Sequence, residues 1–295
     1  MGRYRKVVLI TGATSGIGFA LAKCFRKEGY FLILTSSSRE RLQQAAIELR
    51  KSIPGRKEGI AVICQDLSLP DAAEQLYARL KKKGIKVDIL VNNAGIGMLG
   101  EAAENNLEKL HQMIQVNIKA LTQLCTLFLH EMYREGSGKI LNVASVGAFQ
   151  PGPYTASYYA SKAYVASYSR AIRHEAAGKG VQVCTLYPGT TRTDFFRRAG
   201  GETPFWAMPA DKVARIAFAG LMKNREIIVP GMFNRLLLLV PVKIKLKAVA
   251  GIKRRTACTG LHGKHYVTAQ FPINPDSRKR DDEFSLRLAE PPGFY

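Results

Sequence analysis

Residues 7–18, VVLITGATSGIG, carry a short apolar run straight into a turn with three glycines. An amphipathic pattern follows over residues 18–28 and predicts a helix. Glycines let a backbone turn sharply and let a pyrophosphate approach main-chain N–H groups at a helix N-terminus. A tight strand-to-helix turn without any ligand would use the same residues, so the three glycines alone do not decide the function.

The chain beyond this turn repeats the same alternation as far as residue 230. Short β-branched and aliphatic runs alternate with amphipathic stretches, which is typical of βα units around a parallel sheet. We therefore predict, over residues 1–230, an α/β domain with a Rossmann-type doubly wound seven-stranded parallel sheet and helices on both faces. The predicted strands are residues 7–11, 31–35, 60–65, 89–92, 139–143, 181–187 and 227–229. The predicted helices are residues 18–28, 39–51, 70–83, 105–135, 157–178 and 210–223.

The composition of the 295 residues, 46% apolar and 23% charged, is that of a globular protein and excludes a disordered or collagen-like chain. Five widely spaced cysteines, an odd number, favour reduced thiols in a cytoplasmic protein. The apolar run 7–10 is too short for a signal peptide, and no stretch reaches the roughly 20 apolar residues of a membrane-spanning helix. No metal site is expected, because only His262 and His265 have ligand-like spacing and no acid or cysteine pattern completes a site around them.

The net charge of +21 is densest towards the C-terminal side, where residues 223–255 hold nine basic residues and one acidic residue. We divide the end of the chain into an apolar and basic extension, 231–255, and a poorly ordered tail, 256–295. The extension could make peripheral contact with an anionic membrane, or it could pack its leucines on the domain and leave its lysines in water. We favour packing, because Lys243 and Lys245 fall on opposite sides of a helical wheel.

The spacing Gly-x-x-x-Gly-x-Gly, with Thr11 before it, resembles the short-chain dehydrogenase/reductase family. Further motifs of that family follow in order, each on the predicted element where the family has it: Asp66, Asn92-Asn93-Ala94-Gly95, Asn117, Ser145, Tyr158 with Lys162, Pro188-Gly189 and Thr193. Three segments also resemble the bacterial ketoacyl-reductase-like subgroup: residues 92–100 (NNAGIGMLG), residues 187–195 (YPGTTRTDF), and residues 226–231 followed by Asn234-Arg235-Leu236. The resemblance covers about residues 5–230.

This resemblance implies a nicotinamide dinucleotide as cofactor. A carboxylate after the second strand would bind the ribose 2′-hydroxyl and repel a 2′-phosphate. Ser36, Ser37 and Arg39 stand there with no carboxylate before Glu40, which favours NADP and leaves NAD as the alternative. Ser15 stands where many NADP-preferring relatives carry a basic residue, and Arg39 could equally be a solvated arginine. The expected cofactor contacts are Gly12, Thr14, Ser15, Gly16, Ile17, Gly18, Ser36, Ser37, Arg39, Asp66, Leu67, Asn93, Ala94, Gly95, Tyr158, Lys162, Pro188, Gly189, Thr191 and Thr193.

Tyr158 and Lys162 lie four residues apart on a predicted helix, so both side chains project from one face. A phenol, with its ordinary pKa of about 10, needs roughly 4 kcal/mol of phenolate stabilisation to act near neutral pH, and an ammonium can contribute to it. Ser145 ends a strand at the edge where open α/β sheets bind ligands. We therefore expect hydride transfer between nicotinamide C4 and a carbonyl or secondary alcohol, with Tyr158 as acid and base and Ser145 holding the substrate oxygen.

The remaining catalytic roles rest on the resemblance. It implies that Lys162 also holds the nicotinamide ribose and that Asn117 bends its helix and holds a water. Without the resemblance, Asn117 would be interpreted as a polar residue on an exposed helix face. Tyr159, next to Tyr158, lacks the four-residue spacing to Lys162.

Residues 190–208 carry a cluster of aromatic and basic side chains: Phe195, Phe196, Phe205, Trp206, Arg192, Arg197 and Arg198. The aromatics could receive an apolar ketone or acyl chain, or only anchor a lid; the arginines could meet an acidic head group. The resemblance implies a homodimer or homotetramer built on helices 105–135 and 157–178. The alternative to an enzyme acting on CH–OH groups is a catalytically silent dinucleotide-binding regulatory or nucleic-acid-associated protein. The set Asn117, Ser145, Tyr158 and Lys162 favours the enzyme, and no recognition motif favours nucleic acid.

Overall fold

The computed structural model describes residues 6–52, 59–201 and 203–260. Its main feature is a seven-stranded sheet with the order β3-β2-β1-β4-β5-β6-β9, in which every neighbouring pair is parallel. The strands are β1 (Val7–Thr11), β2 (Phe31–Ser36), β3 (Ile60–Cys64), β4 (Ile89–Asn92), β5 (Gly138–Val143), β6 (Val181–Leu186) and β9 (Ile227–Ile228). The predicted fold class is confirmed.

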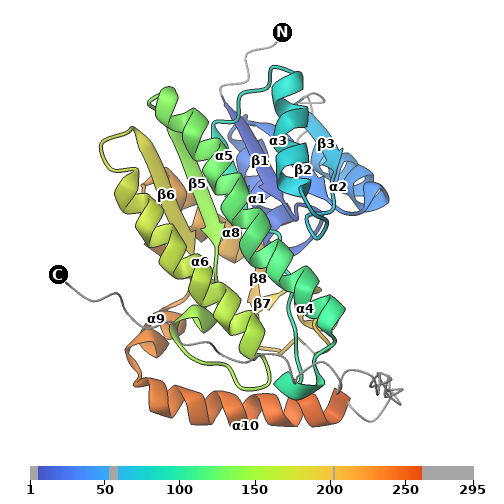
Figure 1. The fold of residues 1–295 in the computed structure, drawn as a ribbon, viewed down its shortest axis with the longest axis vertical. Helices are drawn as coiled ribbons and strands as arrows, with labels where there is room; N and C mark the ends of the chain where they lie inside the picture. The colour runs from blue at the N-terminus through green and yellow to red at the C-terminus, as the bar shows by residue number, and fades with distance from the viewer. Residues whose placement is uncertain (1–5, 53–58, 202, 261–295) are drawn as a thin grey trace, which may run out of the picture. The chain divides into compact units, whose positions relative to one another are not determined.

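Helices cover both faces of this sheet (Figure 1). One face packs against α1 (Gly16–Lys27), α2 (Arg39–Lys51) and α8 (Ala210–Met222), and the other against α3 (Ala72–Lys82), α5 (Leu121–Arg134) and α6 (Ala156–Glu175). Successive strand residues point to opposite faces, so Val8 and Leu9 enter different cores. Strands buried on both faces need continuous apolar runs, which is the pattern that predicted them.

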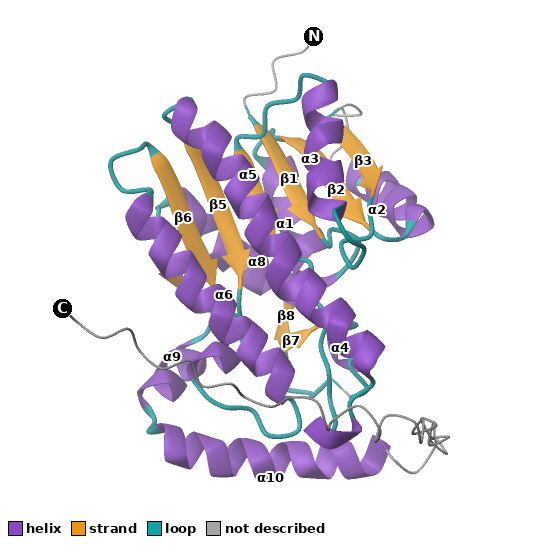
Figure 2. Ribbon diagram, viewed as in Figure 1, coloured by secondary structure: helices purple, strands orange, loops and turns teal. Residues whose placement is uncertain are grey.

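The predicted helix 105–135 is interrupted. It consists of α4 (Leu107–Ile114), a π-helical turn (Gln115–Ala120) and α5, and Asn117 lies inside the turn. The sequence also did not predict a second, two-stranded sheet of β7 (Thr191–Arg192) and β8 (Met208–Pro209), with the short α7 (Phe195–Arg198) between them. The labelled strands of the main sheet end at the edge beside which β7 and β8 lie (Figure 2). We call residues 190–208 the lid.

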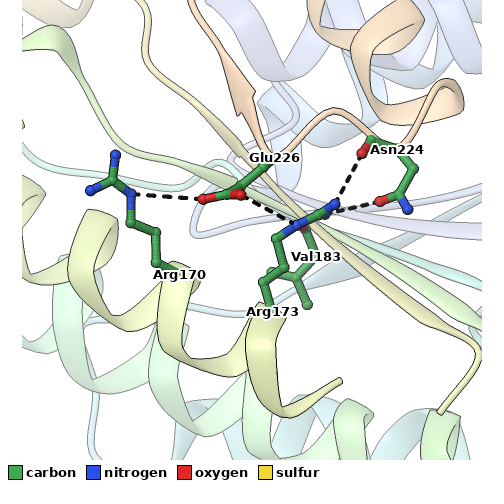
Figure 3. Close-up of polar contacts among 5 residues, drawn as sticks. All are labelled: Arg170, Arg173, Val183, Asn224 and Glu226. Atoms are coloured by element: carbon green, nitrogen blue, oxygen red, sulfur yellow. Dashed lines mark hydrogen bonds and ion pairs between the residues drawn. The ribbon is translucent and has the colours of Figure 1, made fainter. Parts of the chain in front are cut away.

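The far end of α6 is fixed by a group of charged side chains (Figure 3). The Arg173 guanidinium donates hydrogen bonds to Asn224 Oδ1 (2.9 Å) and to the Asn224 carbonyl (3.1 Å). Glu226 lies between the guanidinium groups of Arg170 and Arg173, at 3.9 and 3.8 Å. These contacts fasten α6 to the turn between α8 and β9, and so they hold the helix that carries Tyr158 and Lys162 at its other end.

The C-terminal extension forms two helices, α9 (Met232–Leu239) and α10 (Val242–Gly260). The predicted tail, 256–295, therefore begins within α10, and its residues 261–295 lie outside the described part of the chain. Among the described residues, no helix is both long enough and apolar enough to cross a membrane. Lys245 is buried, and its Nζ lies 3.5 Å from the Phe149 carbonyl oxygen, so α10 packs its first turn against the segment that follows β5.

Candidate active site

The turn from β1 into α1 has glycine where a side chain would not fit. Gly12 and Gly16 have φ angles of +62° and +56°, which favour glycine. A Cβ on Gly12 would lie 2.9 Å from Ala94 Cα, and one on Gly18 would lie 2.4 Å from Asn93 Nδ2. Glycine is therefore required at these positions by backbone conformation or close packing, and the turn lies at the N-terminus of a twelve-residue helix, where phosphate groups can bind.

The loop after β4 is joined to this turn by hydrogen bonds. Asn93 Nδ2 donates to the carbonyls of Thr11 and Gly12, both at 3.0 Å. The main-chain N–H groups of Asn93 and Ala94 donate to Thr11 Oγ1 at 3.0 and 2.9 Å. Two of the expected cofactor-contacting segments, the glycine turn and Asn93-Ala94-Gly95, thus form one rigid unit at the sheet edge.

The residues expected at the adenosine end lie after β2 and β3. Thr14 Oγ1 and Ser36 Oγ are 3.5 Å apart, and Ser37 and Arg39 are exposed beyond them. Glu40, the first carboxylate after β2, accepts a hydrogen bond from Ser38 Oγ at 2.9 Å. Asp66 Oδ1 accepts hydrogen bonds from the N–H and hydroxyl of Ser68, whereas the Leu67 side chain is buried in the core.

Ser145, Tyr158 and Lys162 are brought together between β5 and α6. Lys162 is buried, donates from Nζ to the Val143 carbonyl at 2.9 Å, and lies 5.9 Å from the centre of the Tyr158 ring. Burial lowers the pKa of Lys162 to about 8. Burial also raises the pKa of Tyr158 above its ordinary value, while a hydrogen bond with Ser145 acts in the opposite direction.

Asn117 is fully buried, so the interpretation of an exposed polar residue is wrong. Its Oδ1 accepts from the Ile96 N–H at 2.8 Å, and its Nδ2 donates to the Ile96 carbonyl (2.9 Å) and to Ser161 Oγ (3.0 Å). A Cβ on Gly95 would lie 3.4 Å from both Asn117 Oδ1 and Lys162 Nζ. The π-helical turn therefore places an amide between the loop after β4 and the lysine of α6.

Tyr159 lies in a different environment from Tyr158. A Cβ on Gly152 would lie 2.3 Å from Tyr159 Cγ, and one on Gly147 would lie 3.1 Å from its Cε1, so this ring packs on the loop after β5. The Tyr158 ring instead contacts Phe195 of the lid, with ring centres 5.4 Å apart. Of the two tyrosines, Tyr158 is the one that faces both Lys162 and the lid.

The lid lies against the glycine turn. A Cβ on Gly16 would be 2.8 Å from Thr193 Cγ2, and the Arg198 guanidinium donates to Ser15 Oγ at 3.2 Å. Nearer β6, Thr191 Oγ1 donates to the Gly189 carbonyl at 2.9 Å, and the Pro188 carbonyl accepts from the Val146 N–H at 3.1 Å. The four expected contacts Pro188, Gly189, Thr191 and Thr193 thus lie between the glycine turn and the loop that follows Ser145.

One neighbour of this site, Ser161, was not singled out from the sequence, and two others, Asn234 and Arg198, were singled out for other reasons. Ser161 receives the Asn117 hydrogen bond and donates to the Tyr158 carbonyl at 2.7 Å, while Asn234 packs on Gly189. Arg198 was expected to meet a substrate head group, but it lies at Ser15. Phe205 and Trp206 are 88% and 64% exposed, so they do not anchor the lid to the domain. Nothing in a single sequence distinguishes these contacts from ordinary surface or helix residues.

A doubly wound sheet with a glycine turn and a Ser-Tyr-Lys group at its carboxyl edge defines a dinucleotide-dependent oxidoreductase of the Rossmann type. The pattern of the family described as short chain dehydrogenase matches residues 6–202. The chain belongs to this short-chain dehydrogenase family.

Proteins of known identity give the same result. Sulfoacetaldehyde reductase 2 of Chromohalobacter salexigens is 36% identical over 199 residues, which are 66% of this chain and 77% of that protein. Serine 3-dehydrogenase of Agrobacterium fabrum is 35% identical over 196 residues, 66% of this chain and 76% of that protein. The structure of a short-chain dehydrogenase from Sphingobium yanoikuyae in complex with NADPH superposes with a TM-score of 0.72 at 28% identity, covering 88% of this chain and 98% of that one.

Proposed function

We propose that the protein is an NADP-preferring oxidoreductase of this family, in which the bound dinucleotide supplies or accepts a hydride at a carbonyl or secondary alcohol of an apolar substrate. The observation that carries the proposal is the group Ser145, Tyr158 and Lys162 at the sheet edge, one loop away from the glycine turn. Among the described residues, no group of three histidine, cysteine or acidic side chains could hold a metal ion.

The residues at this edge fit a dinucleotide. The main chain of the glycine turn, at the N-terminus of α1, would hold its pyrophosphate, and Ser36, Ser37 and Arg39 would meet the adenosine ribose. Asn93-Ala94-Gly95 and the segment from Pro188 to Thr193 would hold the nicotinamide end. The relative from Sphingobium, with NADPH bound in the same fold, supports this assignment.

Each side chain has a distinct task in carbonyl reduction. Tyr158 donates the proton from its Oη to the substrate oxygen as the alkoxide forms. Ser145 hydrogen-bonds the same oxygen and keeps it within reach of Tyr158. Lys162, with its pKa of about 8, is mostly charged at neutral pH and stabilises the phenolate that Tyr158 becomes. Asn117 fixes Ile96 and with it the neighbouring Gly95, which lies close to Lys162 Nζ; its role in holding a water stays a prediction from the resemblance.

The preference for NADP rests on the charges around the adenosine end. Arg198 brings a guanidinium to Ser15, the position where many NADP-preferring relatives carry a basic residue. No carboxylate stands at residues 36–39 to repel a 2′-phosphate, and the first one, Glu40, is turned to the Ser38 hydroxyl. Replacing Arg198 with alanine should therefore weaken the binding of NADPH more than the binding of NADH, since only NADPH carries the extra phosphate for the guanidinium to bind. An equal loss of affinity for the two nucleotides would remove the support that Arg198 gives to a preference for NADP.

The preference for an apolar substrate rests on Phe195. Its ring lies over Tyr158 and fills the space beside Gly97, where a Cβ would be 2.6 Å from Phe195 Cζ. An apolar wall beside the proton donor favours a ketone or acyl chain without charge near the carbonyl.

The proposal is tested by exchanging Tyr158 for phenylalanine, with Tyr159→Phe as the matched control. NADPH oxidation is followed with a panel of apolar ketones and β-keto thioesters. We expect Tyr158→Phe to lose about a thousandfold in turnover, the contribution of a positioned proton donor, and the control to keep most of it. Both variants should still bind NADPH, which is measured by quenching of Trp206, the only tryptophan. Equal turnover of Tyr158→Phe and the parent would refute the assignment.

A further inference from the structure

The two C-terminal helices present an apolar surface to solvent. On α9, Met232, Phe233, Leu236 and Leu239 are 68%, 72%, 56% and 81% exposed. Val242 and Ile244, at the start of α10, continue this surface and are also exposed. We call these six residues the apolar patch. Leu238, on α9, packs on the core instead, so α9 is apolar both towards the domain and away from it. A helix that is apolar all round is normally covered on every side.

The charge around the apolar patch has one sign. Residues 227–260 contain seven basic residues and no acidic residue. Arg235, Lys243, Lys247 and Arg254 are exposed along the same two helices. From the sequence, we favoured packing on the domain over membrane contact, because Lys243 and Lys245 fall on opposite sides of a helical wheel. In the structure Lys245 turns inward to the Phe149 carbonyl, so the outer side keeps only the exposed lysines.

We propose that α9 and the beginning of α10 bind the surface of an anionic lipid bilayer, with the apolar patch in the acyl boundary and the exposed basic side chains at the lipid head groups. Helices of this kind, with large apolar side chains on one face and Lys and Arg beside them, lie in the membrane interface. Attraction of the basic residues to anionic lipid adds to the burial of the patch.

Charge distinguishes this occupant from a second copy of the chain. In a two-fold symmetric contact the same surface meets itself, which would bring the basic side chains of both copies together with no carboxylate from residues 227–260 to pair with them. A nucleic acid would satisfy the charges but would leave the six apolar side chains without a partner. An anionic bilayer satisfies both features.

The neighbouring elements place this surface beside the active site. A Cβ on Gly231, just before α9, would lie 2.9 Å from Met208 Cε at the end of the lid. The inward side of α9 packs on residues 146–149, which directly follow Ser145. The exposed Phe205 and Trp206 lie three and two residues before Met208.

The test is co-sedimentation of the full-length protein with vesicles of mixed phosphatidylglycerol and phosphatidylcholine, at low and at high salt, and with vesicles of phosphatidylcholine alone. We expect binding to the mixed vesicles at low salt, weakened by salt and by removal of phosphatidylglycerol. Charge reversal in Lys243→Glu/Lys247→Glu should weaken binding by roughly fivefold or more per lysine. Phe233→Ser/Leu239→Ser should weaken it by about tenfold or more.

Two control variants make the same kinds of substitution at exposed positions outside the apolar patch. Lys82→Glu/Lys83→Glu reverses two exposed lysines at the end of α3, and Ile47→Ser removes an exposed apolar side chain from α2. Both controls should bind vesicles like the parent, and all variants should unfold at the parent's temperature because the changed side chains are exposed.

Three outcomes would overturn the proposal. The first is absence of parent protein from the mixed vesicles at low salt. The second is a parent oligomer that dissociates in Phe233→Ser/Leu239→Ser, with no vesicle binding, since a second copy would then cover the patch. The third is retention of duplex DNA that depends on Lys243 and Lys247 but not on Phe233 and Leu239.

Discussion

Replacing Lys162 with methionine should change how the stability of the protein depends on pH. The ordinary pKa of a lysine is 10.5, and burial lowers the pKa of Lys162 to about 8. Since the unfolded chain keeps the ordinary value, the charged lysine destabilises the folded protein by about 3 kcal/mol below pH 8. Methionine fills a similar volume without a charge, so this destabilisation is absent from the variant at every pH.

The sign follows from proton binding. Between about pH 8 and pH 10.5 the unfolded chain holds a proton on Lys162 that the folded chain has lost, so the parent gains stability as the pH rises. The free energy of unfolding of the parent relative to Lys162→Met should therefore increase by about 3 kcal/mol across this interval. Loss of the hydrogen bond to the Val143 carbonyl changes the free energy of unfolding of the variant by a similar amount at every pH, so it does not alter how the difference between the two proteins depends on pH.

The measurement is urea unfolding of both proteins at a series of pH values, with the same substitution at the exposed Lys82 as control for the loss of a lysine. The Lys82 variant should follow the parent in parallel. If the free energy of unfolding of Lys162→Met also changes with pH in parallel with that of the parent, the lysine is not held in a desolvated site, and the reasoning from its burial fails.

Three further changes test other parts of the site. Gly16→Val should abolish dinucleotide binding, measured by Trp206 quenching, because φ is +56° there and a Cβ would meet Thr193 at 2.8 Å; unchanged affinity would exclude the turn as the phosphate site. Asn117→Ala should lower the free energy of unfolding by about 3 kcal/mol, since it removes two hydrogen bonds to the main chain of Ile96 and a buried one to Ser161, and a loss below about 1 kcal/mol would contradict that. Arg173→Ala should cost about 2 kcal/mol in the same assay through the lost contacts to Asn224 and Glu226, whereas Arg170→Ala, with one distant ion pair at 3.9 Å, should cost less.

The order and type of the main elements could be predicted because each depends on local pattern. Strands such as β1 and β4 are continuous apolar runs, and the predicted bounds of β1 (Val7–Thr11) and β4 (Ile89–Asn92) agree with the structure. The π-helical turn could not be predicted from the local pattern, and only the resemblance implied that Asn117 bends its helix. The groups that bind the Asn117 side chain, Ile96 and Ser161, are far from it in sequence. The β7–β8 pair depends on a lid whose residues have no strand pattern of their own.

The site shows the same division between local spacing and long-range contact. The four-residue spacing of Tyr158 and Lys162 put both on one helix face, and the structure places Lys162 Nζ near the Tyr158 ring. Arg198 lies 183 residues from Ser15 along the chain, and no pattern in one sequence joins them. Lys245 shows the converse, since a helical wheel gave its direction correctly but could not indicate that this direction is inward.

Burial shifts the pKa values of the two central groups of the site in opposite directions. It raises the pKa of Tyr158, which is the opposite of what proton donation near neutral pH requires, so the phenolate has to be stabilised by a charged neighbour. It lowers the pKa of Lys162 only to about 8, so the ammonium is still mostly charged at neutral pH and can stabilise the phenolate left behind. A more exposed lysine would stabilise the fold better, but its charge would be screened by water and would act more weakly on Tyr158. The instability attributed to Lys162 is therefore a consequence of the same desolvation that strengthens its effect on the tyrosine.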